Sequence, residues 1–274
     1  MSSTQRIQQP RRYLMCRPEH FAVSSEINPW MNRGRQPDRP KALAQWQALH
    51  DTYLQLGHQV ELIEPVPGLD DMVYTANAGL VVDGIALGAR FSVAERRGEE
   101  PHFLDWFAAH GFEVIEPVAT QEGEGDLLLV GNTILAGHGF RSVRASHAEV
   151  ARVFGREVVS LRLVNPAYYH LDTALCVLDD QTISYLPAAF DQPSRDELAA
   201  RFPDAIRLPV PVPDALVVNA VSDGRHVIIP PDTEHFEAQL RERGYHPVPI
   251  DLSELHLGGG GIKCCTLELR GGRS

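Results

Sequence analysis

One local pattern recurs along the chain, and it constrains the fold more than any other feature of the sequence. At a spacing of roughly fifty residues the sequence predicts an apolar strand, a tight polar turn, a second strand, an amphipathic helix and a short closing strand. Strand pairs are predicted over residues 77–91, 125–139, 172–186 and 215–230, with turns at Asp83-Gly84, Gly131-Asn132, Asp179-Asp180 and Asp223-Gly224. Helices are predicted over residues 41–57, 100–110, 145–154, 194–202 and 232–244. The pattern indicates about five copies of one α/β unit.

Units that cannot bury their apolar faces alone must stack in a row or close into a ring. A closed ring of mixed α/β units has a central channel, where loops from every unit converge. A strand over residues 263–270 could complete the unit begun by residues 11–18 and so join the two ends. No shift in composition marks a boundary, so we expect a single domain over residues 1–274, with residues 1–12 as a flexible tail. The Pro-, Arg- and Gly-rich segment 28–40 is the candidate lid loop.

Composition limits the class of protein. The chain has 274 residues, of which 43% are hydrophobic, enough for one large domain or two modest ones. Its net charge of −11 argues against non-specific binding to nucleic acid or to anionic membranes, but allows a small cationic substrate. No apolar run approaches the ~20 residues of a membrane span, and the polar start does not resemble a secretory signal. We therefore expect a cytoplasmic protein.

The cysteines are few and two of them are adjacent, in "GGGGIKCCTLELR" near residue 264. Four cysteines, at positions 16, 176, 264 and 265, make no disulfide framework in a chain of this length, and adjacent cysteines rarely pair. Zinc sites need cysteine or histidine partners at fixed offsets, which do not occur here. Each cysteine is therefore read as reduced, and as either core filler or a nucleophile.

Side-chain alternation distinguishes the adjacent pair. If residues 263–270 form a strand, Cys265 shares an apolar face with two leucines and Cys264 shares the polar face. The glycines at 258–261 let the backbone approach a ligand closely. Lys263 could stabilise a thiolate, which an unperturbed thiol needs in order to act as a nucleophile at neutral pH. On these grounds packing and nucleophilic roles both remain open for Cys264.

Several motifs in order resemble one known group of proteins. From "MCRPEHFAVSSEINPWM" (15–31) to "GGGIKCCTLEL" (259–269), the chain resembles the guanidino-group-modifying superfamily. This group includes dimethylarginine dimethylaminohydrolases, arginine deiminases, arginine dihydrolases and amidinotransferases. The resemblance implies the pentein fold, a five-bladed α/β propeller of pseudo-fivefold repeats around a central active-site channel. It also implies that the first cysteine of the pair, Cys264, is the nucleophile, with no metal or organic cofactor.

The resemblance assigns acid–base residues to two further motifs. In "YYHLDTALC" (168–176), His170 matches the general acid/base histidine and Asp172 the aspartate that follows it. Strand alternation puts both on one face, and imidazole titrates near neutral pH. "QEGEGDLLLVG" (121–131) matches a stretch with a catalytic acid followed by an aspartate, here Asp126. We favour Glu122 as the acid and keep Glu124 as the alternate. Without the resemblance, the histidine reads as structural and the acids as a solvated turn.

Residues that would bind the substrate's other groups follow from the same resemblance. Arg96, in "ARFSVAERRGEE", and Arg141, in "GHGFRSV", match arginines that contact a substrate carboxylate. Asp71 matches an aspartate of the family, but Asn77 stands where dimethylarginine hydrolases and deiminases have a guanidinium-binding aspartate. Asn77 together with Asn28, in "INPWM", instead resembles the arginine dihydrolases, which carry hydrolysis past citrulline to ornithine.

These matches predict a cysteine-dependent hydrolase of arginine or an N-methylated arginine. Glu122, Asp126 and Asp172 would orient the guanidinium while Cys264 attacks its carbon to form a thiouronium, and His170 would protonate the departing amine and then activate water. An amidinotransferase, in which an amine replaces water, is the alternative, and a ribosome-binding pentein without enzymatic activity is a remote one. The expected partner is a small guanidino amino acid, and a homo-oligomer stays open.

Overall fold

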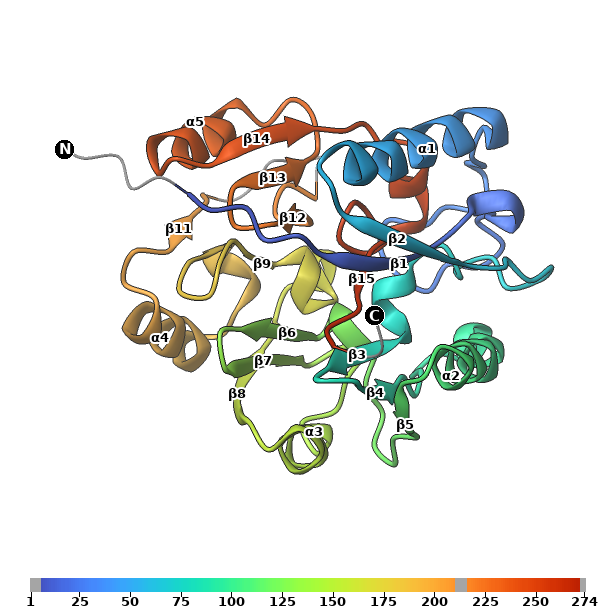
Figure 1. Ribbon diagram of the computed structural model, residues 1–274, viewed down its shortest axis with the longest axis horizontal. Coiled ribbons are helices and arrows are strands. Elements are labelled where there is room, and N and C mark those ends of the chain that lie inside the picture. Colours follow the sequence, from blue (N-terminus) through green and yellow to red (C-terminus); the bar gives the residue numbers. More distant parts are fainter. Residues whose placement is uncertain (1–5, 210–215, 272–274) are drawn as a thin grey trace.

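The computed structural model describes residues 6–209 and 216–271. Its β-structure consists of five three-stranded sheets. In each sheet the first two strands are antiparallel, and the second and third are parallel and connected by a helix. Figure 1 shows the sheets around the middle of the molecule and the helices at its outside. This mixed α/β arrangement agrees with the repeated unit predicted from the sequence.

Each sheet has a first, a second and a third strand, and each second strand is connected to its third strand by a helix. The first strands are β15 (Leu267–Glu268), β3 (Gly79–Val82), β6 (Leu127–Val130), β9 (Leu175–Val177) and β12 (Val221–Ser222). The second strands are β1 (Arg12–Cys16), β4 (Ile85–Gly88), β7 (Thr133–His138), β10 (Ile183–Tyr185) and β13 (His226–Ile229). The third strands are β2 (Gln59–Ile63), β5 (Glu113–Ile115), β8 (Glu157–Arg162), β11 (Ile206–Arg207) and β14 (His246–Pro249). The connecting helices are α1 (Arg39–Gln55), α2 (Glu100–Ala109), α3 (Ser146–Phe154), α4 (Gln192–Arg201) and α5 (Glu234–Glu242).

Local chemistry explains why these elements begin and end where they do. Asp83 and Gly84 both have positive φ, 53° and 84°, as the two-residue turn between β3 and β4 requires. Asp38 caps α1 by accepting a hydrogen bond from the Lys41 N–H, and Asp191 caps α4 through the Ser194 N–H. All five helices lie close to their predicted bounds.

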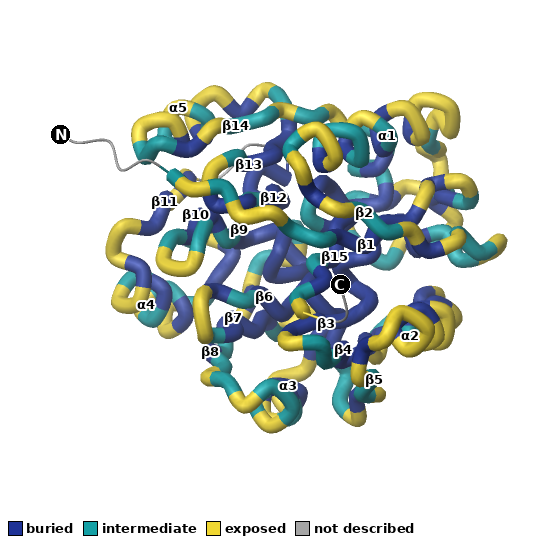
Figure 2. The backbone as a smooth tube through the Cα atoms, in the orientation of Figure 1, coloured by how far each residue is buried: buried dark blue, intermediate teal, exposed yellow. Residues whose placement is uncertain are grey.

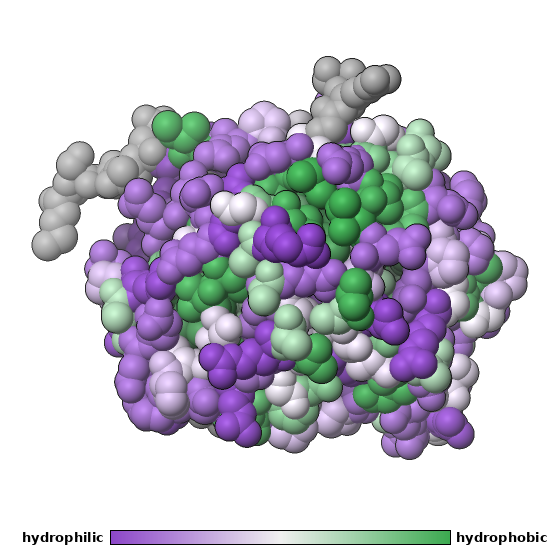
Figure 3. Space-filling view, turned by 90° about the horizontal axis from the view of Figure 1, so that it is seen from below, coloured by the Kyte–Doolittle hydropathy of each residue, from purple (hydrophilic) through white to green (hydrophobic). Residues whose placement is uncertain are grey.

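The two ends of the chain share one sheet. Tyr13 of β1 pairs with Glu268 of β15, and β1 also pairs in parallel with β2. This confirms the predicted closure. Burial is greatest around the middle of the molecule and falls toward the helices (Figure 2). The face shown in Figure 3 carries mostly hydrophilic side chains with smaller apolar groups between them.

Four predictions about segments need correction. Residues 262–265 form a turn closed by a hydrogen bond from the Cys265 N–H to the Gly261 carbonyl, so the strand predicted over 263–270 is reduced to β15. The strand predicted from residue 172 begins only at Leu175. The pair predicted over 215–230 is shorter, and residue 215 lies outside the described residues. Residues 1–5 also lie outside them, but residues 6–12 are no tail, because Gln9 bonds to the Asp223 carbonyl and Arg12 begins β1.

Candidate active site

Tight turns that precede the first strands of the sheets carry the candidate residues. The 3₁₀ turn Thr75–Ala78 leads into β3, Gly123–Gly125 into β6 and Leu171–Thr173 into β9. Comparable turns lead into β12 and β15. Because neighbouring first strands contact one another, these turns meet at the middle of the molecule. The site residues they hold are Asn77, Glu122, His170, Asp172, Asn219 and Cys264.

The thiol of Cys264 is buried beside a carboxylate and an amide. Its Sγ lies 3.2 Å from Asp172 Oδ2 and accepts a hydrogen bond from Asn219 Nδ2 at 3.1 Å. Burial and the neighbouring Asp172 raise the pKa of Cys264 well above its ordinary value. Without a ligand, the protein therefore holds this group as a neutral thiol that donates to Asp172.

Cys265 has different surroundings. Both cysteines pack in the apolar cluster that contains Tyr53 and Ile262, but among the described residues only Cys264 has polar side chains at its sulfur. Burial raises the pKa of the Cys265 thiol above its ordinary value. The strand alternation used to separate the two cysteines is absent, because both lie in the turn 262–265. The turn nevertheless directs Cys264 toward polar groups and Cys265 into the core.

His170 is held from behind by Glu122. The Nε2 atom of His170 lies 2.8 Å from Glu122 Oε2, and both side chains are buried. Glu122 also accepts hydrogen bonds from Arg141 Nη1 at 3.1 Å and from the Ser92 hydroxyl at 2.7 Å. Burial alone would raise the pKa of Glu122, but the hydrogen bond from His170 and the charges of the histidine and Arg141 lower it strongly. Glu122 is therefore a carboxylate that fixes the imidazole ring with Nδ1 facing away from it.

Arg96 orients Asn77. Its guanidinium makes a two-point contact with the buried Glu99, at 2.9 and 2.8 Å, and donates from Nη1 to Asn77 Oδ1 at 2.5 Å. Because Arg96 can only donate, the Asn77 atom that faces it must be the oxygen. The Asn77 amide nitrogen then points away from Arg96. A carboxylate at this position would present an acceptor instead.

Buried polar atoms without a hydrogen-bond partner gather at this site. Among the described residues they include Asp71 Oδ1, Asp172 Oδ1, His170 Nδ1 and Asn77 Nδ2. Buried polar atoms are normally paired, so unpaired atoms in one place indicate a ligand site. Two of the four are carboxylate oxygens, and these would suit a cation with several N–H donors.

Two of these groups, Asp71 and Asn77, line a small cavity. Its volume is about 10 Å³, and its walls include Asp71, Asn77, Arg96, Arg141 and Cys264. Ile27 and Asn28 cover one side: Arg141 donates to the Ile27 carbonyl at 2.9 Å, and Asn28 Nδ2 donates to the Gly258 carbonyl at 3.0 Å. A cavity of this volume holds about one water molecule. A substrate the size of an amino acid can therefore enter only if part of the wall moves.

The glycine run packs tightly against the site. A Cβ on Gly260 would lie 2.3 Å from the Tyr74 ring, and one on Gly259 would lie 2.6 Å from Asn28 Oδ1. Gly259 also has a φ of 84°, which favours glycine. Any larger residue at these two positions would therefore clash with side chains that line the cavity.

Two of the acids predicted to act at the site have other surroundings. Asp126 accepts hydrogen bonds from the Ser142 hydroxyl at 2.6 Å and the Leu171 N–H at 3.0 Å, so it holds the turn that carries His170 and does not line the cavity. Glu124 pairs with Lys263 at 2.6 Å and with Arg270, away from His170. Lys263 is thereby directed toward Glu124 instead of toward the thiol of Cys264.

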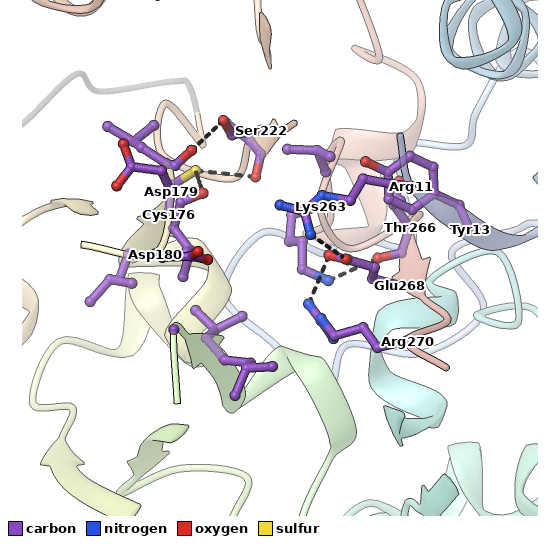
Figure 4. A pocket seen from close by; sticks show the side chains of 18 residues that line it. Arg11, Tyr13, Cys176, Asp179, Asp180, Ser222, Lys263, Thr266, Glu268 and Arg270 are labelled. Carbon is purple, nitrogen blue, oxygen red and sulfur yellow. Dashed lines mark hydrogen bonds and ion pairs between the residues drawn. The ribbon is translucent and has the colours of Figure 1, made fainter. Parts of the chain in front are cut away.

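Lys263 and Arg270 border a second cavity. Its volume is about 120 Å³, and Lys263, Glu268 and Arg270 lie on one side of it while Cys176 and Asp179 lie on the other (Figure 4). Cys176 donates to the Ala220 carbonyl, and burial raises the pKa of its thiol to about 12. The second cavity therefore contains no activated thiol among the residues that line it.

Sequence reasoning missed Asn219 and Glu99, which contact Cys264 and Arg96 directly. A signal for Asn219 was present in the repeat. It stands two residues before β12, as Asn77 stands two before β3, and Asp172 and Cys264 stand three before β9 and β15. Glu99 had no comparable signal, because an acid in "RRGEE" reads as a solvated helix start.

We expect the buried Asp71 to destabilise the ligand-free protein at neutral pH. Burial raises the pKa of Asp71 to about 7, above the ~4 of an unfolded aspartate. Between these values the folded state binds more protons, so stability falls as pH rises. Asp71→Asn should therefore gain about 2–3 kcal/mol relative to wild type between pH 5 and pH 7.

Urea unfolding at both pH values measures this difference. Asp83→Asn, in the exposed β3–β4 turn, is the matched control. Its free energy of unfolding should depend on pH in the same way as that of wild type. An equal effect of pH on the stability of wild type and Asp71→Asn would contradict the assignment.

The structure shows no helix, within residues 6–209 and 216–271, that is long and apolar enough to cross a membrane. In the same ranges no three His, Cys, Asp or Glu side chains are grouped so that they could hold a metal ion.

Comparison with known proteins places the chain in a family. The family model described as N,N dimethylarginine dimethylhydrolase, eukaryotic, matches residues 15–271. An N(G),N(G)-dimethylarginine dimethylaminohydrolase of Mycobacterium tuberculosis is 52% identical over 98% of this chain and 89% of that protein. A bifunctional arginine dihydrolase/ornithine cyclodeaminase of Synechocystis is 39% identical over 94% of this chain, which spans only 37% of that protein.

A solved structure shows the same relationship. The N-terminal domain of a cyanobacterial arginine dihydrolase, a cysteine-to-serine mutant bound to substrate, superposes with a TM-score of 0.91. It is 38% identical, with 95% of this chain and 98% of that chain covered. The chain therefore belongs to the N,N-dimethylarginine dimethylhydrolase family, within the pentein superfamily.

Proposed function

We propose that this protein hydrolyses the guanidino group of arginine or of an N-methylated arginine, with Cys264 as the nucleophile. One observation carries the proposal: a buried thiol lies beside Asp172 in a cavity whose neighbouring carboxylate oxygens lack partners among the described residues. A guanidinium supplies both the positive charge and the N–H donors that these oxygens need. The names of the relatives support the same chemistry.

Substrate binding would itself activate the thiol. The negative charge of Asp172 contributes to the raised pKa of Cys264. A guanidinium that pairs with Asp172 offsets this charge and favours the thiolate. Nδ1 of His170, which Glu122 leaves free, can accept the thiol proton. The nucleophile would then form only when a cationic substrate is present.

The reaction follows in two halves. The Cys264 sulfur forms a bond to the guanidino carbon, His170 gives its proton to the departing nitrogen, and the C–N bond breaks to leave a thiouronium. His170 then takes a proton from water, the oxygen bonds to the carbon, and the C–S bond breaks with its electrons on sulfur. The products are an amine or ammonia and a ureido amino acid.

Arg141 and the segment 28–40 would control access. Arg141 donates to the Ile27 carbonyl, and Trp30 Nε1 donates to the Ala167 carbonyl at 2.8 Å. We propose that this segment is a lid that lifts to admit substrate, whose carboxylate then replaces the Ile27 carbonyl on Arg141. Arg96 lines the same cavity, but its guanidinium donates to Asn77. Its role in this proposal is to orient Asn77, and Arg141 alone binds the substrate carboxylate.

The orientation of Asn77 bears on the product. Its free Nδ2 is a donor, which cannot pair with guanidinium N–H groups but can donate to a ureido oxygen. This favours retention and further hydrolysis of a ureido intermediate, as in the arginine dihydrolase resemblance. In this proposal the five sheets form one propeller-shaped domain, with the site at its centre.

Product analysis tests the function. Purified protein is incubated separately with L-arginine, monomethylarginine and asymmetric dimethylarginine, and products are identified by mass spectrometry. We expect a ureido amino acid, or ornithine with ammonia, from at least one substrate. Citrulline with a methylamine only from methylated substrates indicates a dimethylargininase, whereas ornithine from arginine indicates a dihydrolase. No turnover of any of the three would overturn the proposal.

A further inference from the structure

The sulfur of Cys264 has a hydrogen-bond donor that the sequence motifs do not include. Asn219, in the turn before β12, is 1% exposed and lies between two other turns of the site. Its Oδ1 accepts from the Cys264 N–H at 3.2 Å, and its Nδ2 donates to the Asp172 carbonyl at 3.0 Å. The third contact, from Nδ2 to Cys264 Sγ, is 3.1 Å long.

The first two contacts fix which end of the amide faces the sulfur. A backbone N–H can only donate and a backbone carbonyl can only accept, so Oδ1 must face Cys264 N and Nδ2 must face Asp172 O. The second hydrogen of Nδ2 is then directed to Cys264 Sγ. Both amide hydrogens are used, and the donor cannot turn away without breaking two backbone contacts.

Asp172 and Asn219 therefore have opposite effects on the same sulfur. Asp172 accepts the thiol hydrogen and disfavours a negative sulfur, whereas the N–H of Asn219 favours it. When a cation pairs with Asp172, the contribution of Asn219 remains. The same contact would stabilise the sulfur twice in the proposed reaction: when it attacks, and when the C–S bond breaks with its electrons on sulfur.

We propose that Asn219 is a catalytic residue that stabilises the Cys264 thiolate by a direct hydrogen bond. Its role in turnover rests on the proposed guanidino hydrolysis, but its effect on the thiol does not. A merely structural Asn219 would tie the turns of β9, β12 and β15 together without changing the reactivity of the sulfur. The two roles predict opposite results for chemical modification of the thiol.

The experiment measures alkylation of Cys264 by iodoacetamide between pH 6 and pH 10, without substrate, in the full-length protein. Tandem mass spectrometry assigns the adduct to Cys264 or to Cys265. Asn219→Ala should slow alkylation of Cys264 about 10-fold at each pH below the midpoint of the profile. Asn219→Asp keeps the shape and the acceptor for the Cys264 N–H but adds a negative charge, and should slow it about 100-fold. Asn132→Ala, in the exposed β6–β7 turn, should match wild type.

Equal or faster alkylation in Asn219→Ala and Asn219→Asp would overturn the proposal, because loss of a structural tie exposes the thiol. In turnover, kcat should fall by about the same factors while KM changes less than about threefold. A wild-type protein that hydrolyses none of the three substrates would refute the proposed function alone, since the alkylation series needs no turnover.

Discussion

Cys264→Ser should lower kcat at least about 10⁴-fold, whereas Cys265→Ser should stay within about tenfold of wild type. A serine hydroxyl at position 264 is a much weaker nucleophile, and no group of the site is placed to deprotonate it as readily. Cys265 is buried in the apolar cluster around Tyr53, so its hydroxyl analogue would affect stability instead, by about 1–3 kcal/mol.

Steady-state kinetics at a temperature where both variants are folded, as judged by circular dichroism, separates the two cysteines. Wild-type protein alkylated at Cys264 provides an independent control and should also be inactive. Comparable losses in the two serine variants would show that the turn 262–265 is needed only as a structural unit.

His170→Ala should lower kcat about 10³-fold, with a small change in KM. The variant loses the group that moves a proton between sulfur, amine and water. It also leaves Glu122 as a buried carboxylate held by Arg141 and Ser92 alone. Glu122→Gln should have a smaller effect, about 10²-fold, because an amide can still contact Nε2 but does not stabilise an imidazolium.

Turnover with added imidazole distinguishes a lost proton carrier from a damaged fold. Free imidazole should partly restore His170→Ala and should not affect Glu122→Gln. His110→Ala, on an exposed ring stacked against Trp106, is the matched control and should remain fully active. Retention of more than a tenth of wild-type activity by His170→Ala would exclude the proposed role.

The regular parts of the fold could be predicted from local patterns. Turns such as Asp83-Gly84 and the helices were recognisable because their signals lie within a few residues. The turn at Cys264 was not, since "KCCTLEL" alternates like a strand, and only contacts with Tyr74 and Asn219 show why the preceding glycines bend there. Short irregular turns depend on tertiary contacts, which periodicity does not report.

The identities of several site residues could also be predicted from the sequence, but the direction of each side chain could not. Cys264, His170 and Glu122 were singled out by motifs. The structure pairs His170 with Glu122, and Glu122 with Arg141, which lines the same small cavity as Cys264. Asp126 was expected to touch the guanidinium, but its hydrogen bonds to Leu171 and Ser142 turn it inward. Whether a carboxylate faces a ligand or a backbone N–H depends on the direction of its side chain. A sequence motif gives the residue type and spacing but not this direction.

The pairing of β1 with β15 has a consequence for biosynthesis. Tyr13 of β1 can pair with Glu268 of β15 only once residue 268 has been synthesised. The sheet next to Cys264 is therefore completed only after nearly all of the described chain has left the ribosome. Contacts this distant in sequence form slowly. A nascent or truncated polypeptide can pack its earlier units around an incomplete centre, but it would present no positioned sulfur to cellular guanidino compounds. Reactivity is thereby coupled to synthesis of the segment around Glu268.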